Sequence, residues 1–321
     1  MAKAKPLSLL SVFLCLAYVS LFSGDHVARK LLVQSFTSFG LNALLFLVAG
    51  TIFIIIGRSK KLQLIPDTKK GVFLLFLNGL YASAMVIFLQ LGLSNSSAGL
   101  ANAVFCAYPM ITYLTSVIFL KEDSLSLSKF LGFGIVFTGF YILISSIGQN
   151  QAVSFPIIIA TFMIGSQLCL VRKLTPRYGI VPTITWQHVV TGLVCMTLSI
   201  FWGFLKSPFS VELIYSSLLP FIYLAVAVNV FAYLIQAYLL KMHLASSVSA
   251  FILLRPLMGF VIAAVFLSEV INVQILISAI ITGIGVAWIF KGEESLRFIV
   301  DHYKKNRLYP ITQQKKSKRN V

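Results

Sequence analysis

The sequence predicts an all-α membrane protein whose ten transmembrane helices form two inverted five-helix repeats. Three observations lead to this fold class: the composition, the number of long apolar runs, and an internal repeat of rare residues. Of 321 residues, 58% are hydrophobic and 11% are charged, and the mean hydropathy is +0.93. An average soluble domain is about 25% charged. The composition therefore excludes a soluble globular protein, a disordered protein and a nucleic-acid-binding module.

Ten apolar runs follow one another along the chain, and each is close to the ~20 residues that cross a bilayer. The first begins at Leu7, after Lys3 and Lys5, and continues to about Leu32. It is too long for a signal-peptide core and has no small-residue cleavage site, so we expect a retained first helix. The other nine runs cover roughly 38–57, 71–93, 97–120, 130–148, 154–171, 181–205, 215–240, 245–268 and 272–290.

The basic residues predict how these helices cross the membrane. A cytoplasmic N-terminus places 22 of the 26 Lys and Arg residues on cytoplasmic segments, three on the opposite side, and Arg255 inside a helix. The positive-inside rule then predicts that both termini are cytoplasmic, in a multi-pass protein of the plasma membrane (the inner membrane of a bacterium). Residues 291–321 form a basic cytoplasmic tail, which either binds anionic lipid or only anchors the topology.

An internal repeat divides the chain into two halves, residues 1–148 and 154–290. Pro109 precedes Glu122 by 13 residues, Pro256 precedes Glu269 by the same 13, and the two pairs are offset by 147. The tripeptide Arg29-Lys30-Leu31 recurs as Arg172-Lys173-Leu174 at an offset of 143. Each half holds five helices, and five is odd, so the halves have opposite membrane orientations. Inverted repeats of this kind are typical of transporters, with the substrate site between the halves.

The residues of this repeat resemble a known family. Residues 22–31, F-S-G-D-H-V-A-R-K-L, resemble the first-helix pattern of the EamA group in the drug/metabolite transporter superfamily. The segments 98–122 and 245–269 are similar to that group's fourth and ninth helices, with small residues, a mid-helix proline and a terminal glutamate. Residues 42–46, N-A-L-L-F, lack the arginine that the family often carries there. The resemblance implies a ten-helix solute carrier with a central cavity lined by both halves.

Arg255 is the main candidate for substrate binding. It lies about ten residues into the ninth run, directly before Pro256, and a charge at that depth costs ~2.5–3.5 kcal/mol on insertion scales. Its guanidinium group can bind a carboxylate or phosphate through two hydrogen bonds. The alternative is that it pairs with carbonyls freed by Pro256 or with an acidic partner. Its repeat counterpart, Tyr108, is expected to face the same cavity.

Polar and aromatic residues of other apolar runs are expected to complete a pocket around Arg255. Such side chains can line a cavity and stack on planar solutes. The alternative is that they form hydrogen bonds between helices. The candidates are Asn78, Tyr81, Trp186, His188 and Tyr233.

A second set of residues is interpreted as gates or hinges. Asp25, Arg29 and Lys30, together with His26, form i,i+4 pairs near the end of the first helix. They predict an external gate or a proton-sensitive site, or alternatively an interfacial cluster at a helix end. Pro109 and Pro256 bend their helices at equivalent places and serve either as hinges or as static kinks. Glu122 and Glu269 are interpreted as structural residues that cap the following helix or hold a loop.

No motif predicts an enzyme, and no cofactor or metal is expected. The sequence has no HExxH, GxSxG or Walker A pattern, and its four cysteines are isolated in apolar stretches, which is typical of small buried side chains. We predict a carrier that moves a small organic metabolite, anionic or zwitterionic, by alternating access for export or exchange. Its partners are the substrate and the lipid bilayer, without nucleic acid, and it is a monomer or homodimer. The alternative is a non-transporting assembly or lipid-handling protein.

Overall fold

The computed structural model describes residues 7–32, 36–93, 104, 107–145, 155–203, 211–258, 262 and 273–291, without the side chains at 26, 27, 30, 93, 143, 144 and 211–216. Within these ranges every regular element is a helix, which confirms the all-α fold class. Six helices are long and apolar enough to cross a membrane, and four shorter apolar helices accompany them. Glu269 and the basic tail after 291 lie outside the described residues, so the interpretations made for them stay predictions.

The first predicted run is interrupted, while the next runs give long helices. Ser8 caps the first helix by accepting a hydrogen bond from Ser11 N–H at 3.2 Å. Gly24 then separates α1 from α2, although the apolar run itself is continuous. The elements up to residue 145 are α1 (Leu9–Ser23), α2 (Asp25–Leu32), α3 (Ser38–Ser59), α4 (Lys69–Leu93), α6 (Tyr108–Thr115), a π-helical segment η1 (Ser116–Leu120) and α7 (Leu127–Ser145).

The second half contains more irregular helix. Gly179 has φ of 91°, a conformation that favours glycine, and it lets α9 begin directly after α8. The eighth run contains ten π-helical residues, and the ninth contains a 3₁₀ turn before Arg255. The elements are α8 (Phe155–Tyr178), α9 (Ile180–Trp202), α10 (Val211–Ile222), η2 (Tyr223–Ala232), α11 (Tyr233–Met242), α12 (Ala245–Ala250), η3 (Phe251–Leu254) and the final helix Val273–Lys291.

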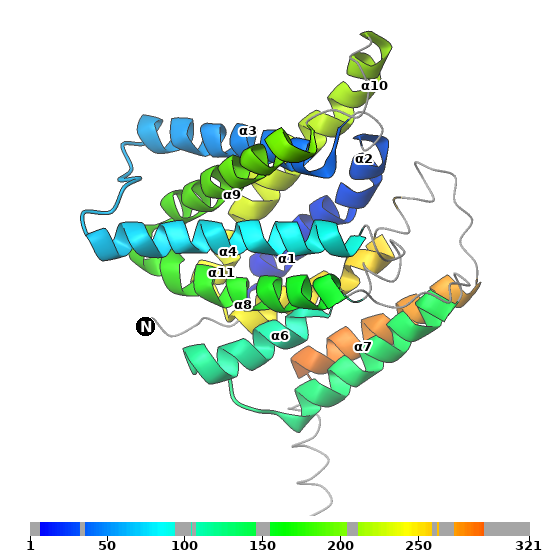
Figure 1. Ribbon diagram of the computed structural model, residues 1–321. Helices are drawn as coiled ribbons and strands as arrows, with labels where there is room; N and C mark the ends of the chain where they lie inside the picture. The colour runs from blue at the N-terminus through cyan, green and yellow to red at the C-terminus, as the bar shows by residue number, and fades with distance from the viewer. Residues whose placement is uncertain are drawn as a thin grey trace, which may run out of the picture.

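Helices from the two halves interleave rather than forming separate bundles. In Figure 1, α3 crosses beside α9, and α4 lies beside α8. On the far side of the bundle, α1 packs against η2 and α11, while α6 contacts both α8 and α12. The final helix, drawn in orange, lies along α7. Because each half contacts the other over most of its helices, a site between the halves is surrounded by protein.

The seam between α7 and the final helix depends on small residues. A Cβ atom on Gly132 would lie 2.6 Å from Ile289 Cγ1, and one on Gly139 would lie 2.5 Å from Thr282 Oγ1. Ser278 donates a hydrogen bond to the Gly139 carbonyl at 2.8 Å. Glycines on membrane helices permit this close backbone approach. The two helices are therefore joined by close van der Waals contact and by this hydrogen bond.

Polarity is distributed as expected for a chain surrounded by lipid. Large apolar side chains are exposed on the outer faces of the helices, for example Phe73, Phe162 and Ile200. Polar side chains such as Gln167 and His188 are buried between helices instead. A bilayer supplies no hydrogen bonds to its hydrocarbon region, so polar groups are placed inside the protein.

Candidate functional site

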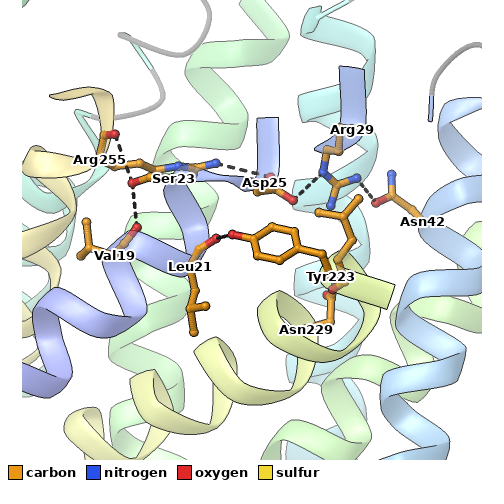
Figure 2. Close-up of polar contacts among 10 residues, drawn as sticks. Val19, Leu21, Ser23, Asp25, Arg29, Asn42, Tyr223, Asn229 and Arg255 are labelled. Atoms are coloured by element: carbon orange, nitrogen blue, oxygen red, sulfur yellow. Dashed lines mark hydrogen bonds and ion pairs between the residues drawn. The ribbon is translucent and has the colours of Figure 1, made fainter. Parts of the chain in front are cut away.

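The interruption of the first helix at Gly24 is filled by a tyrosine from the other half. Tyr223 donates from its hydroxyl to the Leu21 carbonyl at 2.7 Å, as Figure 2 shows. A Cβ atom on Gly24 would collide with the same Tyr223 hydroxyl oxygen. A side chain at position 24 would therefore displace this tyrosine, and the residue after the interruption, Asp25, begins a new helix.

A second interruption lies against the first. Pro256 has no N–H to donate, and the turn before it tightens to 3₁₀ geometry, in which Arg255 N–H bonds to Ile252 O. The carbonyl of Arg255 accepts a hydrogen bond from Ser23 Oγ at 3.2 Å, and the same hydroxyl also donates to Val19 O at 2.7 Å. Figure 2 shows this serine between the two backbones. The irregular points of helices from both halves thus meet at one place.

Three charged side chains gather at this meeting point. Asp25 Oδ1 accepts from Arg29 Nε at 2.8 Å, and its other oxygen, Oδ2, lies 3.4 Å from Arg255 Nη2 (Figure 2). Arg29 also donates from Nη1 to Asn42 Oδ1 at 3.0 Å. Arg255 is 7% exposed and Asp25 is 8% exposed. One carboxylate lies between two guanidinium groups, so these three side chains carry a summed charge of +1, of which Arg255 and Asp25 are buried and Arg29 is partly exposed.

Aromatic rings continue the site toward α9. Phe22 packs edge-on against Tyr233 with ring centroids 5.3 Å apart, and Tyr233 packs edge-on against His188 at 4.8 Å. Phe46 and Phe53 of α3 contact the same imidazole, each at 5.3 Å. The guanidinium carbon of Arg255 lies 6.0 Å from the Phe22 ring centroid, at the outer limit of a cation–π contact. The charged cluster and the aromatic residues are therefore contiguous.

The structure brings together some of the predicted site residues. Arg255, Asp25 and Arg29 are in direct contact, Tyr233 and His188 join them through Phe22, and Pro256 follows Arg255 in the chain. The sequence predicted that Arg255 binds substrate and that Asp25 belongs to a gate. Because Arg255 and Asp25 are in contact, the predicted substrate-binding residues and the predicted gate residues belong to one site. The side chain of Lys30, also predicted for the gate, lies outside the described residues.

The remaining candidates have other surroundings. Tyr81 Oη is 2.6 Å from Ser166 Oγ, a contact between α4 and α8. Trp186 donates from Nε1 to the Leu64 carbonyl at 2.9 Å, in the loop that joins α3 to α4. Asn78 is completely buried, and its amide has no hydrogen-bond partner among the described residues. The buried Tyr108 begins α6, with Pro109 at its first turn.

Sequence reasoning missed Ser23 and Tyr223 as parts of this site and gave Asn42 little weight. A glycine in the middle of an apolar run, followed directly by an aspartate, was the available signal for the interruption. Nothing in the sequence distinguishes Tyr223 from the other aromatic residues of its run. Its function in packing depends on which helix lies opposite.

Two guanidinium groups give this site its chemical character. Guanidinium groups bind carboxylates and phosphates with paired hydrogen bonds, and two of them converge here. Among the described residues there is no group of three or more His, Cys, Asp or Glu side chains that could hold a metal ion. The charged cluster and the adjoining rings offer recognition by charge and by aromatic contact.

Comparison with known proteins identifies the family. The model of the EamA-like transporter family matches twice, over residues 9–145 and 153–291. The chain belongs to the EamA-like transporter family. An Archaeoglobus fulgidus protein described as an uncharacterized transporter is similar to this EamA-like chain, 26% identical over 253 residues that cover 77% of the chain and 86% of the relative. A solved crystal structure, described only as that of a protein, has the same fold, with a TM-score of 0.71 and 15% identity over 87% of this chain and 95% of its own.

Family membership and the apolar helices together establish a multi-pass membrane protein of a transporter family. The resemblance noted in residues 22–31 and in the two proline-containing helices is confirmed by these matches. A small-molecule substrate and a surrounding bilayer follow for an EamA-like protein.

Proposed function

We propose that this EamA-like protein carries a small organic solute, with a carboxylate or phosphate group, across the plasma membrane by alternating access, for export or exchange. The moving parts are two inverted five-helix repeats, residues 1–148 and 154–290, with both termini cytoplasmic. The observation that carries the proposal is the contact of Asp25 with Arg255 at 3.4 Å, beside the hydrogen bond from Ser23 to the Arg255 carbonyl. It joins interrupted helices of the two halves through buried charges.

The pattern of helix contacts supports a two-fold repeat, and an odd number of helices in each half makes that repeat an inverted one. In chain order, the five helices of the first half are α1–α2, α3, α4, α6–η1 and α7, and those of the second are α8, α9, α10–η2–α11, α12–η3 and the final helix. The second helices pack together as α3 with α9, and the fourth as α6 with α12. The first helix of each half packs on the third of the other, as α8 on α4 and α1 on α11.

This pattern is unchanged when the two halves are exchanged. Two conformations related by that exchange have similar contacts and therefore similar energies, with the open side reversed. Discontinuous helices at the interface of such repeats are where carriers bind substrates. Gly24 and Pro256 interrupt one helix in each half at that interface.

The charges at the site favour an anionic or zwitterionic substrate. The excess positive charge of Arg255, Arg29 and Asp25 is unfavourable in a low-dielectric environment and is neutralised by one anionic group. A carboxylate on Arg255 takes the place of Asp25, which keeps its shorter contact with Arg29 at 2.8 Å. Phe22 and Tyr233 then lie against the apolar part of the solute.

Counterflow in liposomes tests this proposal. The purified protein is reconstituted and screened with labelled carboxylates, phosphate esters, amines and neutral metabolites. We expect saturable counterflow for one or more anionic or zwitterionic solutes. Arg255→Gln should lose roughly ten- to 150-fold in apparent affinity, because a hydrogen bond to a charged group is worth about 1.5–3 kcal/mol. Arg58→Gln, at the exposed end of α3, is the matched control and should transport normally.

Each part of the proposal has its own contrary result. The absence of counterflow for every solute class refutes transport and favours the non-transporting alternative. Transport restricted to cations or neutral solutes refutes the assignment of Arg255. Unchanged affinity in Arg255→Gln, at matched protein abundance, refutes the site while leaving transport intact.

A further inference from the structure

Two consecutive acidic residues of the first half, Glu122 and Asp123, follow the end of η1. Lys121 has φ of 54°, in the left-handed region, and it turns the chain out of the helix so that the next residues point toward the second half. Glu122 then accepts from Arg172 Nε at 3.1 Å and from Nη2 at 3.3 Å. Arg172 is 3% exposed although its tripeptide was predicted to lie outside the bilayer. This largely buried ion pair joins the segment after η1 in one half to α8, the first helix of the other.

The neighbouring carboxylate makes a second contact between the halves. Asp123 Oδ2 accepts from Ser246 Oγ, at the start of α12, at 2.8 Å. Within its own half, Asp123 accepts from Ser116 Oγ at 2.7 Å and from Lys129 Nζ at 2.8 Å. Its side chain is 2% exposed. Two adjacent carboxylates therefore connect the first half to both α8 and α12 of the second.

We propose that the pairs Glu122–Arg172 and Asp123–Ser246 form a latch that closes the cytoplasmic end of the interface and opens in each transport cycle. The inference rests on the proposed function, which requires a barrier at each end of the interface, and on the predicted topology, which places this end in the cytoplasm. The latch is separate from the charged cluster of Asp25, Arg29 and Arg255, because no residue belongs to both.

Arg172 and Asp123 each keep partners within their own half when the latch opens, and these contacts make the opening reversible. Arg172 donates from Nη1 to the Leu240 carbonyl at 2.9 Å and to the Lys241 carbonyl at 2.6 Å, and both belong to its own half. Asp123 keeps Lys129 and Ser116. Removing one partner of a buried ion pair is costly mainly because it leaves an uncompensated charge. After separation the two carbonyls still solvate Arg172 and Lys129 still neutralises Asp123, while Glu122, whose side chain is already 12% exposed, meets the water that enters, so the contact can break at a moderate cost.

A natural cysteine reports whether the latch is open. Cys169 lies one turn before Arg172 on α8, is 3% exposed, and its Sγ is 3.4 Å from the Thr112 carbonyl of α6. It therefore lies inside the interface that the latch closes. A thiol reacts with a maleimide only where it meets water as a thiolate. With Cys15, Cys106 and Cys195 replaced by alanine, labelling from the cytoplasmic side of inside-out vesicles by a membrane-impermeant maleimide measures access to Cys169.

We expect Glu122→Gln to increase the labelling rate of Cys169 about tenfold or more, because a neutral amide holds a guanidinium group less strongly than a carboxylate does. Lys173→Gln is the matched control. It removes an exposed charge next to Arg172 on α8 that takes part in neither latch pair, and it should leave the rate unchanged. A second protein that keeps only Cys195, completely buried in α9, should show no increase on Glu122→Gln.

The outcomes separate the latch from the proposed function. Wild-type labelling of Cys169 in Glu122→Gln, in a protein that shows counterflow, refutes the latch alone. Equal increases at Cys169 and Cys195, or an increase in Lys173→Gln as large as in Glu122→Gln, also refute it, because they indicate general loosening. A wild-type protein without counterflow for any solute refutes the proposed function and the cycle on which the latch depends.

Discussion

Replacing Asp25 with asparagine should strengthen the binding of an anionic solute while weakening the fold. In the ligand-free protein this carboxylate lies between Arg29 and Arg255, and an incoming anion competes with it for Arg255. Asparagine has nearly the same shape but no charge. The substitution therefore removes the competitor and increases the positive charge that the anion neutralises. Affinity and stability are expected to change in opposite directions.

The lengths of the two Asp25 ion pairs set the expected changes in anion affinity and in stability. The contact from Asp25 to Arg255, at 3.4 Å, is longer than a usual N–H···O hydrogen bond, so we take the lower end of the charged range, about 1.5 kcal/mol. That corresponds to about a tenfold gain in affinity. The pair with Arg29 is shorter, 2.8 Å, but the Arg29 side chain is 25% exposed and partly screened. We therefore expect a stability loss of about 2–3 kcal/mol, below the ~3–5 kcal/mol of a fully buried pair.

Two assays on the same protein measure these quantities. Counterflow gives the apparent affinity for the best anionic solute of the screen, and thermal unfolding in detergent gives the stability. Asp67→Asn, in the exposed loop before α4, is the control and should change neither. An anion affinity that falls or stays constant in Asp25→Asn would show that Asp25 does not compete for Arg255, and the reasoning about the site would be wrong.

Three further predictions concern packing and topology. Gly24→Ala should destabilise the protein by about 1–3 kcal/mol, the usual cost of overpacking. Adding Tyr223→Phe should recover part of this loss, because it removes the colliding hydroxyl oxygen. Full stability in Gly24→Ala would contradict the close approach of Tyr223 to Gly24. Gly139→Ala should lower the unfolding temperature, whereas Gly134→Ala on the same helix, where a Cβ atom would meet nothing within 4 Å, should be neutral or stabilising by up to about 1 kcal/mol. Reporter fusions at 146–151 and at the C-terminus should report opposite sides of the membrane, and signals from the same side would refute the ten-helix topology.

Apolar run length was sufficient to predict the helices but not their interruptions. Counting apolar residues treats 7–32 as one span, because Gly24 barely changes the hydropathy of the segment. The interruption depends on Tyr223, which belongs to a helix about 200 residues away in the chain. The π-helical segment that begins at Tyr223 is likewise absent from any periodic pattern.

The charged residues were identified, and the pair Asp25–Arg29 was predicted from its i,i+4 spacing, but the partners contributed by the opposite half were not named. A charge inside an apolar run is conspicuous, so Arg255 could be selected from the sequence. Its contact with Asp25 joins residues 230 positions apart and depends on how the two halves pack. Arg172 was expected at the cytoplasmic surface, since it begins a basic stretch, yet it is buried by Glu122 and by two backbone carbonyls. Hydropathy places a residue by depth in the membrane, and it carries no information about the opposing helix.

The glycine seam between α7 and the final helix restricts how the halves can move. A Cβ atom at Gly285 would meet Val136 N at 2.8 Å, and one at Gly132 would meet Ile289 N at 3.0 Å. The backbones of α7 and the final helix are therefore in close contact at both glycines. Sliding either helix by one residue would drive a side chain into the opposing backbone. In the proposed alternating-access cycle these two helices, one from each half, are therefore expected to move together, and the other helices are expected to rearrange around the pair.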